Sequence, residues 1–275
     1  MPEATLDKAR IDGMEIAYRD EGEGEPVLLL HGWPTSSFLW RHVIPTLAEE
    51  NRVIAPDLPG FGASSKPLDR RYDFELFESV LDGLMAELAI EETGLAVHDL
   101  GGPIGVHWAI GRPGEVTKLA LLNTLLYPEF DPSVAEFVIA LSTPERRDEL
   151  TSPEGLGEVL SLGLADDSHV TEQALAGIRA PFRDEDSRLA LAKAGIQLPP
   201  EGFAEIAAGL PTLDIPVCAI YGEEDRILPD VAATMSRVDD DVPDGARITG
   251  LPGCGHFLQE EAPGEVGELL AQFFS

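Results

Sequence analysis

The chain has 275 residues, of which 50 are acidic and 19 basic, so its formal net charge is −31. A charge of this sign and size repels nucleic acid and anionic lipid, and it argues against either as a partner. The acidic residues are scattered along the chain, and only four residues are lysines. This pattern is typical of a solvated surface, and we interpret it as that of a halophilic protein.

Length and hydrophobic content suit one large α/β domain, because 44% of the residues are hydrophobic and they fall in short runs. No run approaches the roughly 20 apolar residues needed to cross a bilayer. Residues 1–8 lack the pattern of a secretory signal, so we expect a cytoplasmic protein. The two cysteines, Cys218 and Cys254, are not spaced like zinc ligands, and no metal site is expected.

Strand-like apolar runs alternate with helix-like stretches, a pattern that predicts a mostly parallel sheet with crossover helices. The run at 27–31 (Val-Leu-Leu-Leu-His) is almost wholly apolar, as expected of a strand buried on both faces. In chain order, strands are predicted at residues 9–19, 27–31, 52–56, 93–98, 118–123, 215–221 and 246–249. Helices are predicted at residues 74–88, about 103–112 and 263–274.

Residues 128–210 interrupt this alternation with helical patterns and no convincing strand. The helical patterns are broken by prolines, namely Pro144, Pro153, Pro181, Pro199 and Pro200. A helical insertion late in an α/β sheet is expected to form a cap over the strand ends where ligands bind. We therefore divide the chain into a core of residues 1–127 and 211–275 and a helical cap of residues 128–210.

Asp99 is the first candidate for chemistry. It lies in residues 97–102 (Val-His-Asp-Leu-Gly-Gly), between a predicted strand and a predicted helix. A strand-to-helix turn followed by small residues lifts its apex side chain clear of the sheet, as in a nucleophile elbow. Taken alone, an aspartate before a helix is more often a simple N-cap.

Two later segments favour the catalytic interpretation. Asp225 ends the segment Tyr-Gly-Glu-Glu-Asp just beyond a predicted strand, and His256 lies in the tight loop Gly-Cys-Gly-His-Phe. The order nucleophile, acid, histidine is that of the α/β hydrolases. We therefore predict a triad of Asp99 as nucleophile, Asp225 as acid and His256 as base.

The loop His31-Gly32-Trp33-Pro34 follows the buried strand and is the fourth piece of the predicted site. In this fold, one backbone N–H of the oxyanion hole comes from this loop and the other from the residue after the nucleophile. The two donors would be the N–H groups of Trp33 and Leu100.

These motifs resemble those of the haloalkane dehalogenases. The similar segments are residues 31–41 (His-Gly-Trp-Pro-Thr-Ser-Ser-Phe-Leu-Trp-Arg), 57–64 (Asp-Leu-Pro-Gly-Phe-Gly-Ala-Ser), 97–99 with Gly101, and 106–109 (Val-His-Trp-Ala). The resemblance covers the core, whereas the cap matches only in length and in residues 180–182 (Ala-Pro-Phe). It implies an α/β-hydrolase fold with a mostly parallel eight-stranded sheet, flanking helices and a helical cap. Epoxide hydrolases are close relatives of this family.

The resemblance also bears on the acid. Some dehalogenases carry it after the sixth strand, where this chain has Asn123. Asparagine cannot serve as the anionic partner of a histidine, so Asp225 remains the predicted acid.

The implied reaction forms and then hydrolyses an alkyl ester on Asp99. Water deprotonated by His256 would attack the ester, and Asp225 would stabilise the imidazolium. The substrate would be a small apolar organic molecule that reacts with water, and neither a metal nor an organic cofactor is required.

A haloalkane dehalogenase and an epoxide hydrolase differ in the residues that they need to stabilise the leaving group. Leu100 replaces the tryptophan that binds halide in many dehalogenases, and Trp33 replaces the usual Asn or Glu. Trp33 is then either a halide donor or an apolar wall, and Phe182 and His169 are further candidate substrate contacts. An epoxide hydrolase would need an acid in the cap, which contains no tyrosine, although Tyr127 lies at its edge.

Haloalkane hydrolysis is the leading hypothesis, because Val97 is typical of dehalogenases, whereas epoxide hydrolases tend to have glycine there. Epoxide hydrolysis is the alternative. A non-hydrolytic small-molecule binding protein of the same fold is a third hypothesis. A serine esterase is not favoured, because Ser64 and Ser65 lie in the wrong loop.

Overall fold

Eight strands form one sheet in the computed structural model, which describes residues 6–275. They are β1 (Asp7–Ile11), β2 (Met14–Glu21), β3 (Glu25–Leu30), β4 (Asn51–Pro56), β5 (Thr93–His98), β6 (Val116–Leu122), β7 (Val217–Gly222) and β8 (Ala246–Leu251). Their order is β1-β2-β4-β3-β5-β6-β7-β8, and only the β1–β2 and β2–β4 pairs are antiparallel. The mostly parallel eight-stranded sheet is thus confirmed.

The single strand predicted at residues 9–19 is wrong, because the chain reverses at Asp12 and Gly13. Both residues have positive φ, 49° and 81°, and they join β1 to β2 as a hairpin. Asp-Gly is a strong two-residue hairpin signal. The prediction missed it because apolar residues continue on either side of the turn, at Ile11, Met14 and Ile16.

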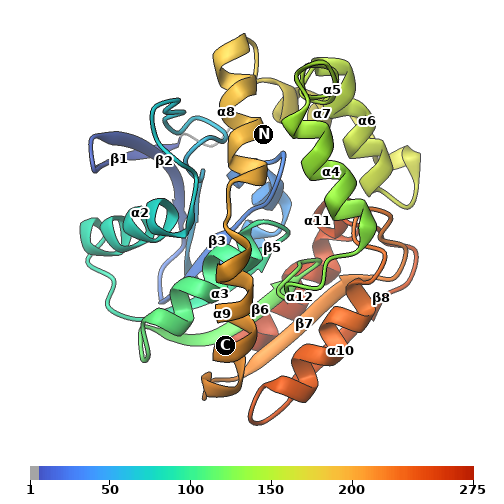
Figure 1. The fold of residues 1–275 in the computed structure, drawn as a ribbon. Coiled ribbons are helices and arrows are strands. Elements are labelled where there is room, and N and C mark those ends of the chain that lie inside the picture. The colour runs from blue at the N-terminus through green and yellow to red at the C-terminus, as the bar shows by residue number, and fades with distance from the viewer. Residues whose placement is uncertain (1–5) are drawn as a thin grey trace.

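Helices cover both faces of the sheet, as Figure 1 shows. The core helices are α1 (Ile44–Leu47), α2 (Phe74–Glu87), α3 (Gly101–Gly111), α10 (Val231–Asp241), α11 (Leu258–Glu261) and α12 (Pro263–Phe274), with a 3₁₀ helix η1 at Ser37–His42. Leu28 and Leu30 of β3 pack in the cluster that contains α2, α3 and α10, whereas Val27 and Leu29 pack in the cluster with α1 and α12. β3 is therefore buried on both faces, as predicted.

Six helices lie between β6 and β7, in the region predicted to be helical. They are α4 (Pro132–Ser142), α5 (Pro144–Leu150), α6 (Pro153–Gly163), α7 (Glu172–Arg179), α8 (Glu185–Ile196) and α9 (Pro200–Gly209), with 3₁₀ turns η2 (Asp167–His169) and η3 (Leu210–Thr212). Three of the prolines that were expected to break helices are instead the first residues of helices, namely Pro144, Pro153 and Pro200. Proline is tolerated at the first helical position because no hydrogen bond is lost there.

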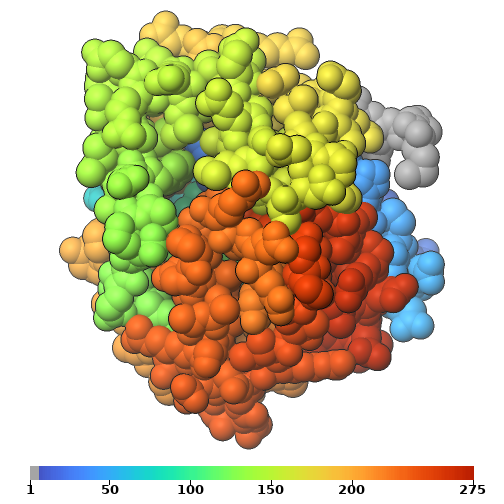
Figure 2. Space-filling model, turned by 90° about the vertical axis from the view of Figure 1, so that its right-hand side faces the viewer, coloured from blue at the N-terminus to red at the C-terminus, as the bar shows by residue number. Residues whose placement is uncertain are grey.

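The helices of this insertion lie in two different positions relative to the sheet. Helices α4 to α8 gather at one end of the sheet, whereas α9 returns along the core and contacts α3 (Figure 1). Figure 2 shows a small hollow between the light-green and yellow parts of the insertion, with blue and teal atoms from the N-terminal part of the chain at its bottom. On this face, the two parts of the insertion therefore do not cover the N-terminal part of the chain completely.

Among residues 6–275, no helix combines the length and the apolar character that a membrane span requires.

Candidate active site

Asp99 stands at a sharp turn between β5 and α3, with φ at +49°. Non-glycine residues seldom adopt this left-handed conformation, and it is typical of the apex of a nucleophile elbow. The turn is tight on all sides. A Cβ atom on Gly101 would lie 2.6 Å from the carbonyl oxygen of His31, and one on Gly102 would lie 1.7 Å from Oγ1 of Thr124. That same Oγ1 donates to the carbonyl of Asp99 at 2.7 Å and fixes the apex.

The two carboxylate oxygens of Asp99 have different surroundings. Oδ1 accepts a hydrogen bond from the backbone N–H of Trp33 at 2.6 Å, and the backbone N–H of Leu100 also bonds this carboxylate. Oδ2 lies 3.5 Å from Nε2 of His256, and 12% of the Asp99 side chain is exposed. One oxygen is thus held by the N–H of Trp33, a predicted oxyanion donor, while the other faces the histidine.

His256 connects the two aspartates. Its Nδ1 lies 2.8 Å from Oδ2 of Asp225, and both side chains are fully buried. Oδ1 of Asp225 accepts the backbone N–H groups of Ile227 and Leu228, each at 2.8 Å. The structure therefore brings together all three residues of the predicted triad in the expected order of contacts.

Asn123 contributes to the site in a way that sequence reasoning missed. Its side-chain N–H donates to Oδ2 of Asp225 at 2.7 Å, and its side-chain oxygen accepts the N–H of Gly222 at 3.0 Å. The residue was set aside because it cannot be an anionic acid, yet it binds the acid. Its position at the end of β6, next to β7, was the available signal.

In the site, charges and hydrogen bonds shift the pKa of each triad residue in the direction opposite to the effect of burial. Burial alone would lower the pKa of His256, but the charge and hydrogen bond of Asp225, together with Asp99, raise it to about 10. Burial alone would raise the pKa of Asp99, but the hydrogen bond and charge of His256 hold it below its ordinary value. The pKa of Asp225 is lowered in the same way, against burial, by His256 and Asn123. All three pKa shifts favour an imidazolium between two carboxylates in the resting site.

The raised pKa of His256 predicts that stability depends on pH. A group whose folded pKa exceeds its unfolded pKa stabilises the fold fully below the unfolded value, about 6.5, and loses that contribution as pH rises through about 10. We expect the free energy of unfolding to fall over that window by on the order of a few kcal/mol. Urea unfolding at several pH values measures this fall.

The matching variants identify the titrating group. A His256→Gln variant should lose the slope, whereas His169→Gln, an equivalent change in the half-buried η2 turn, should keep it. A slope that persists in His256→Gln would assign the titration to another residue.

Two buried residues hold the loops beside Asp99. His31 accepts the N–H of Leu58 at Nε2, 3.0 Å away, and its Nδ1 donates to the carbonyl of Gly32, also at 3.0 Å. Burial lowers the pKa of His31, which suits a neutral ring that both donates and accepts.

His98 is buried as well, and its Nε2 donates to the carbonyl of His256 at 2.9 Å. Burial and the charge of His256 lower the pKa of His98 to about 3, so this ring is neutral.

The candidate substrate contacts are placed differently from the triad. The indole N–H of Trp33 donates to the carbonyl of Leu191 in α8 at 3.2 Å, so it is already occupied.

Phe182 is buried in the main core cluster, with its ring 5.7 Å from Nζ of Lys66. His169 lies in the η2 turn, and no hydrogen bond or ion pair within residues 6–275 joins it to Asp99. The hydroxyl of Tyr127 donates to Asp241 at 2.8 Å.

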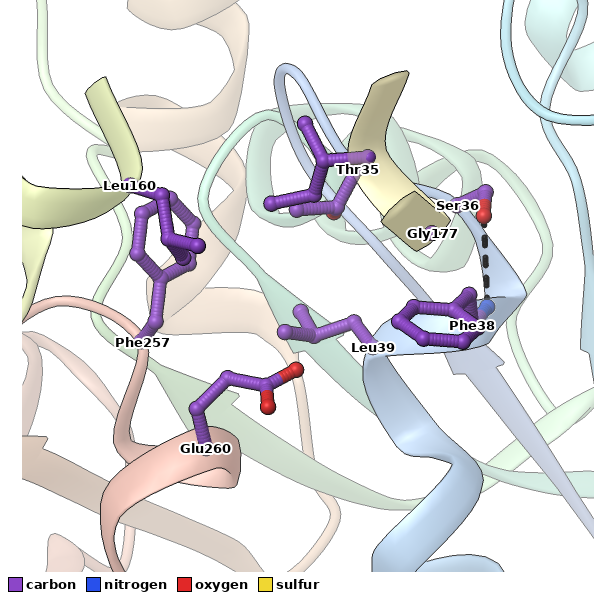
Figure 3. A pocket seen from close by; sticks show the side chains of 9 residues that line it. Thr35, Ser36, Phe38, Leu39, Leu160, Gly177, Phe257 and Glu260 are labelled. Carbon is purple, nitrogen blue, oxygen red and sulfur yellow. Dashed lines mark hydrogen bonds between the residues drawn. The ribbon is translucent and has the colours of Figure 1, made fainter. Parts of the chain in front are cut away.

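A small cavity lies between the insertion and the core, and Phe257, the residue after His256, is part of its lining (Figure 3). Its volume is about 10 Å³, which is enough for about one water molecule. Figure 3 shows Leu160 of the insertion and Phe257 on one side and Thr35 and Phe38 on the other, with the carboxylate of Glu260 below. In the part of the chain that the structure describes, no cluster of three or more potential metal ligands is present.

The sheet order and the buried Asp–His–Asp chain at the ends of β5, β7 and β8 define an α/β hydrolase, and comparisons with known proteins agree. A family model described as alpha/beta hydrolase fold matches residues 25–161. A haloalkane dehalogenase from Agrobacterium fabrum is 30% identical over 94% of this chain and 88% of its own length. A soluble epoxide hydrolase from Corynebacterium sp. strain C12 is 29% identical over 99% of this chain and 98% of its own.

A solved structure agrees with these sequence comparisons. The crystal structure of haloalkane dehalogenase DbeA from Bradyrhizobium elkani USDA94 has a TM-score of 0.86 and 28% identity to this chain, covering 98% of it and 97% of that protein. The chain belongs to the α/β-hydrolase family, as its motifs predicted.

Proposed function

We propose that the protein hydrolyses small haloalkanes through a covalent alkyl ester on Asp99. One observation carries this proposal: the carboxylate at the apex of the elbow has Oδ1 bonded to the Trp33 N–H at 2.6 Å and Oδ2 facing His256 at 3.5 Å. A carboxylate with a lowered pKa is already ionised and needs no base for attack. The direct test is detection of the alkyl ester in a variant that lacks the His256 imidazole.

The first step is a displacement at carbon. A lone pair of Asp99 Oδ2 forms a bond to the carbon that bears the halogen, and the carbon–halogen bond breaks with its electron pair going to the halide. The product is a neutral ester on Asp99. His256 takes no part in bond making here, because the nucleophile is charged before it reacts.

Ester formation changes the charge balance around His256. Asp99 loses its negative charge, and one of the two carboxylates that raise the pKa of His256 disappears. The imidazolium can then release its proton to solvent and become a neutral base. Alkylation of Asp99 in this way prepares the base for the second step.

The second step hydrolyses the ester. Neutral His256 takes a proton from water, whose oxygen attacks the Cγ atom of Asp99, and the N–H groups of Trp33 and Leu100 stabilise the oxyanion that forms. When the bond between Cγ and the alkoxy oxygen breaks, the alkoxide takes the proton from His256 and leaves as the alcohol. The regenerated carboxyl group passes its proton to His256, 3.5 Å away, and restores the imidazolium. Each turnover therefore yields alcohol, halide and the one proton that His256 released to solvent after alkylation.

The surroundings of the leaving group predict a steep preference among halides. The Trp33 indole N–H is bonded to Leu191, and the side chain of Leu100 has no donor, so neither candidate position offers an N–H to the departing halide. Loss of one oriented donor typically costs 10²- to 10³-fold in rate. We expect alkylation by 1-bromobutane and 1-iodobutane to exceed that by 1-chlorobutane by at least about 100-fold. Rapid-quench mass spectrometry measures the three rates.

A Leu100→Trp variant is the matched test of this explanation. It keeps the backbone N–H at position 100 and adds an indole donor beside Asp99. The rate with 1-chlorobutane should then rise relative to that with 1-iodobutane. Similar rates with all three halides in the unaltered protein would contradict the absence of a halide donor.

Epoxide hydrolysis is the second candidate, favoured by the Corynebacterium relative, which matches this chain along nearly its whole length. Attack of Asp99 on an epoxide carbon would give the same kind of ester but would leave an alkoxide that needs a proton donor. Tyr127 is not oriented for this task, because its hydroxyl donates to Asp241. We therefore place haloalkanes first.

A further inference from the structure

The end of α6 in the insertion is hydrogen-bonded to the loop that carries the histidine. We call residues 161–166 the α6 end and residues 254–257 the histidine loop. The carbonyl of Gly163 accepts the backbone N–H of His256 at 2.6 Å and that of Phe257 at 3.2 Å. The backbone of the proposed base is thus bonded directly to the insertion, almost 100 residues away in the sequence.

Glu261, at the end of α11, joins the same two segments through its side chain. Its Oε2 accepts the N–H of Gly255 at 2.6 Å. Its Oε1 accepts the N–H groups of Ala165 at 2.7 Å and Asp166 at 3.2 Å. A single carboxylate therefore binds three backbone donors, one from the histidine loop and two from the α6 end. Hydrogen bonds to an ionised acceptor are about twice as strong as neutral ones.

The two segments also fit closely. A Cβ atom on Gly255 would lie 2.5 Å from the carbonyl oxygen of Gly163, and one on Gly163 would lie 2.4 Å from the ring of Phe257. Arg226, which follows the acid Asp225, donates to the carbonyls of Leu164 and Ser161. The α6 end thus contacts the loops of both the base and the acid, and little space remains for one segment to shift alone.

We propose that Glu261 is a positioning residue for His256 and that it fixes the histidine loop against the α6 end of the insertion. This inference rests on the proposed function, because the step that it controls is hydrolysis of the Asp99 ester. Glu261 touches neither Asp99 nor the imidazole, and it acts through the backbone of Gly255. Misplacement of a reacting group by about 1 Å can cost on the order of 100-fold in rate.

The mechanism separates positioning from general stabilisation. Asp99 attacks the substrate without help from His256, whereas the water that cleaves the ester needs the imidazole in place. A change that only displaces His256 should therefore slow hydrolysis and leave alkylation intact. A change that loosens the whole site should slow both steps.

Glu261→Gln is the test variant, with Glu268→Gln as its control. Glutamine has nearly the shape of glutamate, but its NH₂ group must replace one acceptor oxygen and so faces a backbone N–H in either orientation. Glu268 is an exposed residue of α12, and its replacement makes the same change in charge. Rapid-quench mass spectrometry with 1-bromobutane gives the rates of ester formation and ester hydrolysis separately.

In Glu261→Gln, ester formation should stay within about twofold of the unaltered protein, while ester hydrolysis should slow by about 10- to 100-fold, so that the ester accumulates. Glu268→Gln should leave both rates unchanged. Equal slowing of both steps in Glu261→Gln, or no slowing of either, would overturn the proposal.

Amide hydrogen exchange tests the same contact without any substrate. In Glu261→Gln, amides at residues 163–166 and 255–257 should exchange faster together, while those of β5 and β6 stay protected. Faster exchange in only one of the two segments, or across the whole sheet, would overturn the inference. If the unaltered protein formed no ester at all, the proposed function would fail, and the exchange result would still decide whether Glu261 joins the two segments.

Discussion

A His256→Phe variant incubated with 1-bromobutane is expected to accumulate a butyl ester on Asp99 and to release bromide only once per protein molecule. Attack by Asp99 needs no base, so the ester forms. Its hydrolysis needs Nε2 of His256, which lies 3.5 Å from Oδ2 of Asp99, and phenylalanine has no atom that accepts a proton. Removal of a general base typically costs 10²- to 10⁴-fold, so turnover should fall by at least about 100-fold. Intact-mass analysis and peptide mapping locate the adduct.

Controls make this result specific. An Asp99→Asn, His256→Phe double variant should gain no mass, because the amide is not a nucleophile of comparable strength. An adduct on another residue would remove Asp99 from the mechanism. An adduct with 1,2-epoxybutane and none with 1-bromobutane would favour the epoxide alternative. No adduct with either reagent would favour the hypothesis of a non-hydrolytic binding protein.

Replacement of Asp225 by asparagine should reduce ester hydrolysis by about 10⁴-fold, the cost found when the acid of a comparable triad is replaced by its amide. All four groups that contact the Asp225 carboxylate are donors, namely His256, Asn123 and the N–H groups of Ile227 and Leu228. The NH₂ group of an asparagine would face a donor wherever it pointed, and the imidazolium would lose its nearest charge.

The formation of the ester provides the internal comparison for Asp225→Asn. Alkylation of Asp99 should change by less than about tenfold, since it does not pass through the base. Asp240→Asn, an exposed change on α10, serves as the matched control. Equal losses in both steps would mean that Asp225 supports the site as a whole and does not act on the base.

The meeting of the three triad residues was predictable from the sequence, because it depends on the order in which they follow the strands. Asp99, Asp225 and His256 each follow a predicted strand, and parallel strands end at the same edge of the sheet, so their meeting could be inferred before any distance was known. The strand at 27–31 was equally clear, because a strand buried on both faces is apolar throughout.

Contacts made by residues that no sequence pattern singles out for that contact were not predictable in this way. The bond of Asn123 to Asp225 depends on the register of β6 and β7, and the bond of the Trp33 indole to Leu191 depends on where α8 lies. Glu261 is one of 50 acidic residues, and nothing in its neighbourhood in the sequence distinguishes it from the solvated ones. These contacts join segments far apart in the chain, so they follow from the packing of the insertion and not from a local pattern.

The position of Oδ1 of Asp99 has a consequence for how such an enzyme could diversify. The oxygen that needs stabilisation during hydrolysis belongs to the protein and already accepts the Trp33 N–H before any substrate arrives. In the proposed mechanism, the second step therefore recognises no polar atom of the substrate, and only the shape of its alkyl group matters. Selection for new substrates can then act on the insertion alone, while the core keeps a reaction centre whose ester carbonyl is always its own.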